Sequence, residues 1–168
     1  MQYAWTCACC GKQFDTLPLD WAFDAPNYWD DIPEAERAAR GRLSTEFCVA
    51  DEHFFIRGCL QIPIIGSDEK LVWGVWVSQS VASFKRAQEL FDRDPDPEEA
   101  PRFGWLCNGI RIYQPSTLGL ASNVHFQPNN QRPLITLHDG DHPLIVEQRN
   151  GITLARAEEI AAASMPRH

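Results

Sequence analysis

The sequence contains no apolar run long enough to cross a membrane. The longest, Leu71 to Val77, is far shorter than the about 20 residues that a transmembrane helix needs. The first residues have neither the basic start nor the apolar stretch of a signal peptide, so we expect a cytoplasmic protein with no membrane partner. Because the cytoplasm is reducing, the six cysteines favour thiols or metal ligands over a disulfide framework.

Positive charge is scarce and scattered along the chain. Fifteen Lys and Arg stand against 23 Asp and Glu, which gives a formal net charge of −8. Without a basic patch, binding to nucleic acid or to an anionic membrane surface is not expected. The charge fits a basic protein partner better, and one hypothesis is an acidic immunity-type protein that neutralises such a partner. A small-molecule ligand also stays open.

No recognised catalytic motif is present, and the strongest chemical feature is a C-x2-C pair near the N-terminus. Cys7 and Cys10 have the spacing of a zinc knuckle, and Gly11 follows where a tight turn needs a positive φ. Ordinary surface thiols and a redox pair are the alternatives. A redox pair is disfavoured because the residues after Cys10 do not resemble the first turn of a helix, which would activate a thiol.

A structural zinc site needs four ligands, so two must come from elsewhere in the chain. The candidates are Cys48, Cys59 and Cys107 and the histidines His53, His125, His138 and His142, and Zn is the expected cofactor. If Asp51-Glu52 is a two-residue hairpin loop, Cys48 pairs with Phe55 and Cys59 lies about 13 Å further along the hairpin. A single zinc ion then takes both only if a bulge at Gly58 or a longer loop shifts the strands. Otherwise at least one is a small buried hydrophobic residue.

The fold class that we predict is α+β, as a single domain over residues 1–168 with an antiparallel sheet of about five or six strands. Its core is a meander over 46–79, with β-rich runs at 46–50, 53–65 and 71–78 separated by turn residues. The third run is apolar on both faces, which favours a central strand covered on both sides. Further strands are expected at 103–108, 124–127 and 134–137.

Helical spacing of apolar residues predicts a helix over 80–92, with Ser80 as its N-cap, and a C-terminal helical segment over 142–165. A short surface helix is expected over 33–40. Residues 1–14 carry the cysteine knuckle, and 93–102 form an acidic, proline-rich loop. For 142–150 both strand and helix are open, with Pro143 near the start and Gly151 after the end favouring the helix.

Residues 15–32 combine aromatic side chains with aspartates. Such a segment is either an irregular loop pinned to the core or part of a recognition cleft. The candidate ligand pocket joins it to two residues from elsewhere, and comprises Trp21, Asp24, Tyr28, Trp29, Arg57 and His142. In an enzyme, Arg57 would hold a carboxylate or phosphate and His142 would act as acid or base.

Several blocks of the chain are long and unusual, among them Cys7-x-x-Cys10-Gly, Phe23-Asp-Ala-Pro26, His53 to Leu60, Val72 to Ser78, Phe103-Gly-Trp105 and Asp141 to Leu144. Together they resemble a bacterial family called domain of unknown function 2199. The resemblance spans nearly the whole chain and implies one small cytoplasmic domain, but no activity, since the family has none assigned. It implies that Cys7, Cys10, Cys48 and Cys59 belong to the family pattern, whereas Cys9, Cys107 and His138 do not.

Taken together, these patterns favour a small cytoplasmic binding or interaction protein with a structural zinc site. A site closed by cysteines has no open coordination position, so such a zinc ion would stabilise the fold rather than catalyse. The alternatives are an enzyme with a cleft lined by Trp21, Asp24, Arg57 and His142, and the acidic immunity-type protein.

Overall fold

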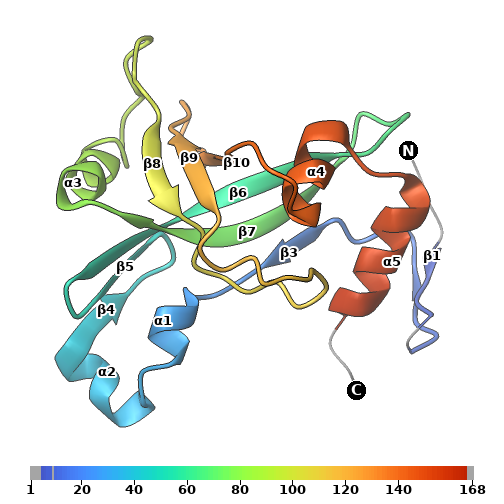
Figure 1. Cartoon of the computed structure of the whole chain (residues 1–168), viewed down its shortest axis with the longest axis horizontal. Coiled ribbons are helices and arrows are strands. Elements are labelled where there is room, and N and C mark those ends of the chain that lie inside the picture. The colour runs from blue at the N-terminus through green and yellow to red at the C-terminus, as the bar shows by residue number, and fades with distance from the viewer. Residues whose placement is uncertain (1–4, 9, 166–168) are drawn as a thin grey trace.

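In the computed structural model, which describes residues 5–8 and 10–165, a mixed sheet of eight strands forms the body of the protein (Figure 1). Its strands are β3 (Asp20–Ala22), β4 (Gly41–Leu43), β5 (Phe47–Ala50), β6 (His53–Pro63), β7 (Lys70–Gln79), β8 (Arg102–Trp105), β9 (Ala121–His125) and β10 (Leu134–Leu137). The strand order is β3-β7-β6-β10-β9-β8, and β5 joins β4 to β6. A separate short hairpin pairs β1 (Trp5–Thr6) with β2 (Gln13–Phe14).

Strands β5, β6 and β7 form the predicted meander. Cys48 pairs with Phe55 and Val49 with Phe54, which confirms the register expected for a two-residue loop. Asp51 in that loop has a φ of 54°, a left-handed conformation that aspartate tolerates better than most residues. Strand β7 is buried over most of its length, because apolar side chains occupy both of its faces.

The prediction of an antiparallel sheet of five or six strands is wrong. Strand β3 runs parallel to β7, with Trp21 opposite Trp73, and β10 runs parallel to β6, with Leu134 opposite Cys59. Alternation of apolar and polar residues reports which face of a strand is buried, and it does not report the direction of a distant partner. The three-residue strands β3 and β4 are too short to give such a pattern, which explains why they are missing from the prediction.

The sheet curls until the segment that begins with β8 reaches β7. Val77 forms an antiparallel bridge with Leu106, and the backbone N–H of Cys107 donates to the carbonyl oxygen of Trp76 at 2.8 Å. Gly104 permits this approach, since a Cβ atom there would lie 2.5 Å from the backbone oxygen of Ser78. The curled sheet therefore shields part of an edge that would otherwise be open to pairing.

Within the described residues, five helices lie beside the sheet, namely α1 (Asn27–Asp30), α2 (Glu34–Arg40), α3 (Val81–Glu89), α4 (Pro143–Asn150) and α5 (Leu154–Ser164). In Figure 1, α4 and α5 lie at one end of the sheet, α3 lies at the other, and α1 and α2 lie near β4. The predicted helix after Ser80 forms, and the Ser80 side chain accepts the N–H of Ser83. The predicted choice of helix for 142–150 is likewise confirmed.

Two groups of buried side chains make up the core, one on each face of β7. Val75 and Val77 belong to the larger group, whereas Trp76 belongs to the smaller one, as expected for neighbouring residues in a strand. The smaller group consists of Ile32, Cys48, Ala50, Phe55 and Trp76. In the part of the chain that the structure describes, no helix combines the length and the apolar character needed to cross a membrane.

Candidate functional site

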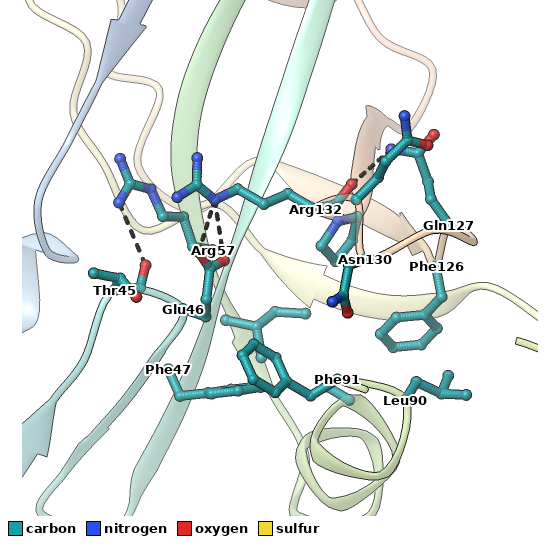
Figure 2. A pocket seen from close by; sticks show the side chains of 14 residues that line it. Thr45, Glu46, Phe47, Arg57, Leu90, Phe91, Phe126, Gln127, Asn130 and Arg132 are labelled. Carbon is teal, nitrogen blue, oxygen red and sulfur yellow. Dashed lines mark hydrogen bonds and ion pairs between the residues drawn. The ribbon is translucent and has the colours of Figure 1, made fainter. Parts of the chain in front are cut away.

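A pocket of about 470 Å³ opens between the start of β5, the middle of β6, the end of α3 and the loop that precedes β10. Figure 2 shows that its side chains divide by type, with charged and amide groups along one side and phenylalanine and leucine side chains along the other. The pocket therefore has a polar wall and an apolar wall. Such a division suits a ligand with one charged end.

The apolar wall is built around two phenylalanines from different elements. The rings of Phe47, from β5, and Phe91, just beyond α3, meet edge to face with centroids 5.6 Å apart. Phe91 is 51% exposed, so about half of its surface remains open to solvent. Leu90 and Phe126 extend the same wall (Figure 2). An apolar group placed here would be removed from water and would also cover Phe91.

The polar wall carries two guanidinium groups and one carboxylate. Nε of Arg132 donates to both carboxylate oxygens of Glu46, at 2.9 and 3.1 Å. Nη1 of Arg57 donates to the carbonyl oxygen of Thr45 at 3.3 Å, while its Nε is buried without a hydrogen-bond partner among the described residues. Two positive groups against one negative group leave this wall with one excess positive charge.

Backbone contacts fix where these charges lie. The N–H of Arg57 donates to the carbonyl oxygen of Glu46 at 3.1 Å, which extends the β5–β6 ladder by one pair and puts both side chains on the same face. Arg132 comes from the loop before β10, where its carbonyl oxygen accepts a hydrogen bond from Gln127 at 2.6 Å. The N–H of Asn129 donates to Asp94 at 2.9 Å, so the same loop is also bound to the acidic, proline-rich loop over 93–102.

Of the six residues predicted to line one ligand pocket, only Arg57 lines this one. Trp21 lies beside a different cavity, together with Trp73 and Met165. The hydroxyl of Tyr28 donates to Asp51 in the β5–β6 loop. Trp29 and Asp24 line neither of these two cavities. The guanidinium of Arg37 lies over the ring of Trp29, and Asp24 is exposed. The structure therefore distributes the predicted set over separate places.

His142, the sixth of them, caps helix α4. Its Nδ1 accepts the backbone N–H of Leu144 at 3.0 Å, so the ring proton must be on Nε2, which donates to the carbonyl oxygen of Pro115 at 2.8 Å. The residue is 8% exposed. With both ring nitrogens engaged by the backbone, His142 holds the loop before β9 against the start of α4.

The knuckle cysteines lie in the β1–β2 hairpin. Gly11 has a φ of 72°, as the sequence predicts, and its N–H donates to the carbonyl oxygen of Cys7 at 2.8 Å. Cys7 is 1% exposed and packs in the larger core group, whereas Cys10 is exposed. Cys9 lies outside the described residues.

The other two cysteines of the family pattern, Cys48 and Cys59, lie on neighbouring strands of the large sheet rather than in the hairpin. Cys48 belongs to the smaller core group, where burial raises the pKa of its thiol to about 12. Cys59 lies on β6 opposite Gly74, and burial raises the pKa of its thiol as well. The register keeps these two cysteines apart, because the partner of Cys48 is Phe55, four residues before Cys59. Within residues 5–8 and 10–165, no three His, Cys, Asp or Glu side chains are grouped to hold a metal ion.

Sequence reasoning missed most of the pocket. Glu46, Arg132, Phe91 and Phe126 were not among the predicted site residues, and only Arg57 gave a signal, as a cation inside an apolar strand. The other four come from the segment before β5, the end of α3 and the segment between β9 and β10, which only the tertiary fold brings together.

Comparison with protein families gives a match, over residues 6–152, to the family described as "Uncharacterized protein conserved in bacteria (DUF2199)". Comparison with curated proteins and with solved structures finds no match. The family match covers most of the 168 residues and includes both the meander and the pocket. The chain therefore belongs to this family of uncharacterised bacterial proteins, as its sequence blocks indicate.

Proposed function

We propose that the protein is a binding protein whose pocket between β5, β6, α3 and the loop before β10 takes a small organic anion with an apolar body. The observation that carries the proposal is the polar wall, in which the guanidinium groups of Arg57 and Arg132 stand against the single carboxylate of Glu46. An anionic oxygen at this wall would form a charge-assisted hydrogen bond with a terminal guanidinium nitrogen, because no described residue accepts one from Nη2 of Arg57 or from the terminal nitrogens of Arg132.

The rest of the pocket supports the same ligand class. Its volume of about 470 Å³ is typical of sites for small molecules. The excess positive charge of the polar wall favours an anion, while Phe47, Phe91 and Phe126 offer aromatic surface for an apolar body. The one acid in the wall, Glu46, is already paired with Arg132, which favours binding over acid–base catalysis.

Isothermal titration calorimetry with 2-naphthoate tests the proposal, with 2-naphthylmethanol as its neutral counterpart. We expect 2-naphthoate to bind and the alcohol to bind at least about tenfold more weakly, because it forms no charge-assisted hydrogen bond. Arg57→Gln should weaken 2-naphthoate by about tenfold or more. Arg149→Gln is a matched control, since Arg149 is an exposed arginine on α4 that pairs with Asp139 and does not line this pocket.

Two results would contradict the proposal. One is the absence of 2-naphthoate binding at millimolar concentration. The other is an equal affinity in Arg57→Gln and in the unmodified protein, which would mean that the ligand binds elsewhere.

A further inference from the structure

We infer that Glu46 restricts this pocket to ligands with a single negative charge, so that its ligand class is the apolar monocarboxylates rather than phosphate esters. The inference rests on the proposed function and adds to it a residue that determines specificity.

The guanidinium nitrogens that do not donate to Glu46 remain available to a ligand. Glu46 binds only Nε of Arg132, and no residue in the described part of the chain accepts a hydrogen bond from the two terminal nitrogens of that side chain. Arg57 offers its Nη2 in the same way, because its hydrogen bond to Thr45 uses only Nη1. A planar carboxylate has two oxygens, each with two lone pairs, and it matches such a set of guanidinium donors.

The charge balance then decides how many negative charges the ligand carries. Two guanidinium groups and one carboxylate leave one excess positive charge, which a monoanion neutralises. A phosphate monoester carries close to two negative charges above pH 7. It would therefore give the wall a net negative charge and would bring its second charge close to the Glu46 carboxylate. In a partly dry pocket such like-charge repulsion lowers affinity by about tenfold or more.

Glu46 is held too firmly to move away from a competing anion. Its backbone oxygen accepts the N–H of Arg57, and the next residue, Phe47, pairs with Ile56 in the ladder. Its side chain is 21% exposed and binds Arg132 through both oxygens. The carboxylate therefore stays in the wall when a ligand enters, and it acts as a fixed negative charge.

The competing explanation is that the Glu46–Arg132 pair only pins the loop before β10 to β5. In that case replacing Glu46 would weaken every ligand of this pocket to a similar degree. If Glu46 selects by charge, the same replacement changes the ratio of affinities between a monoanion and a dianion. The ratio is therefore the readout that separates the two roles.

The experiment is calorimetric titration at pH 8 of 2-naphthoate and 2-naphthyl phosphate, which share the same apolar body. The unmodified protein should bind 2-naphthoate about tenfold tighter or more. In Glu46→Gln, which keeps the shape and removes the charge, the ratio should fall to about one or reverse. Glu46→Asp keeps the charge and should keep the preference, even if both ligands bind more weakly. Glu159→Gln, an exposed acid paired with Arg156 on α5, is the matched control and should leave the ratio unchanged.

The outcomes separate this inference from the proposed function. If the unmodified protein binds 2-naphthyl phosphate as tightly as 2-naphthoate, or if Glu46→Gln leaves the ratio unchanged, the inference is wrong while the anion pocket stands. If neither ligand binds, the proposed function fails and the inference fails with it.

Discussion

The side-chain amide of Asn108 bridges strand β7 and the segment before α1 in the interior of the protein. Its Oδ1 accepts the backbone N–H of Trp76 at 2.7 Å, and its Nδ2 donates to the carbonyl oxygen of Ala25 at 2.9 Å. Asn108 is fully buried, so water cannot replace either contact in the folded protein. One side chain thus satisfies two backbone groups from segments far apart in the sequence.

Replacing Asn108 should lower the free energy of unfolding by more than about 2 kcal/mol. Asn108→Ala leaves two buried backbone groups without partners, and each costs about 1–3 kcal/mol. Urea denaturation followed by tryptophan fluorescence measures the change. Asn150→Ala, at the exposed end of α4, is the control and should stay within about 0.5 kcal/mol of the unmodified protein. A similar small change in Asn108→Ala would show that the bridge contributes little.

The closure of the sheet predicts that Gly104 does not tolerate a side chain. In Gly104→Ala the new Cβ would lie 2.5 Å from the backbone oxygen of Ser78, so β8 must move away from β7. We expect a loss of about 1–3 kcal/mol in the free energy of unfolding, as for other overpacked sites. We also expect faster hydrogen exchange at the N–H of Cys107, which donates to Trp76 across this contact.

Gly109→Ala provides the matched control for that variant. A Cβ at Gly109 would meet nothing closer than 3.5 Å, and its nearest neighbour is the side chain of Asn27. Exchange at Cys107 should therefore stay as slow as in the unmodified protein. If Gly104→Ala behaves in the same way, β8 does not pack on β7 as described.

Short-range patterns were sufficient to predict the meander and the helix after Ser80. The Asp51-Glu52 loop fixes the register between Cys48 and Phe55, and the Ser80 cap fixes the start of α3. The parallel pairings of β3 with β7 and of β10 with β6 had no such local signal. They follow from the way in which connecting segments cross the sheet, which depends on packing over the whole chain.

The candidate site shows the same limit. Arg57 could be picked out from the sequence because charged side chains are rarely buried in an apolar strand unless they are paired. Arg132 looked like an ordinary loop residue, and Phe91 looked like the core-facing end of a helix, yet Phe91 is 51% exposed at the pocket. Aromatic residues next to aspartates in 15–32 suggested a cleft, but the structure uses Tyr28 to contact Asp51 instead.

The contact between Arg40 and Asp51 predicts a specific pH dependence of stability. Hydrogen bonds from Arg40, which have the largest effect, and from Tyr28 hold the pKa of the Asp51 carboxyl well below its usual range. An acid whose pKa is lower in the folded state stabilises the protein above its unfolded pKa of about 4 and loses that contribution as the pH falls. Asp51→Asn should therefore flatten the decrease in melting temperature below pH 4.

Arg40→Gln tests the origin of that effect. It should flatten the decrease in melting temperature below pH 4 in the same way. The double variant should differ little from either single variant, because both substitutions remove the same Arg40–Asp51 interaction. Asparagine also tolerates the positive φ of position 51, so backbone strain does not confuse the comparison. Additive effects of the two substitutions would assign the pH dependence to other acids.

Zinc binding at the N-terminal hairpin stays a prediction, and the structure sharpens how to test it. Plasma mass spectrometry of the purified protein measures zinc per chain. If the hairpin holds the metal, Cys7→Ser and Cys10→Ser should each abolish it. Cys48→Ala should retain it, because Cys48 lies in a different core group from Cys7. Loss of zinc in Cys48→Ala, with the fold intact by circular dichroism, would instead show that Cys48 and the hairpin share one metal ion.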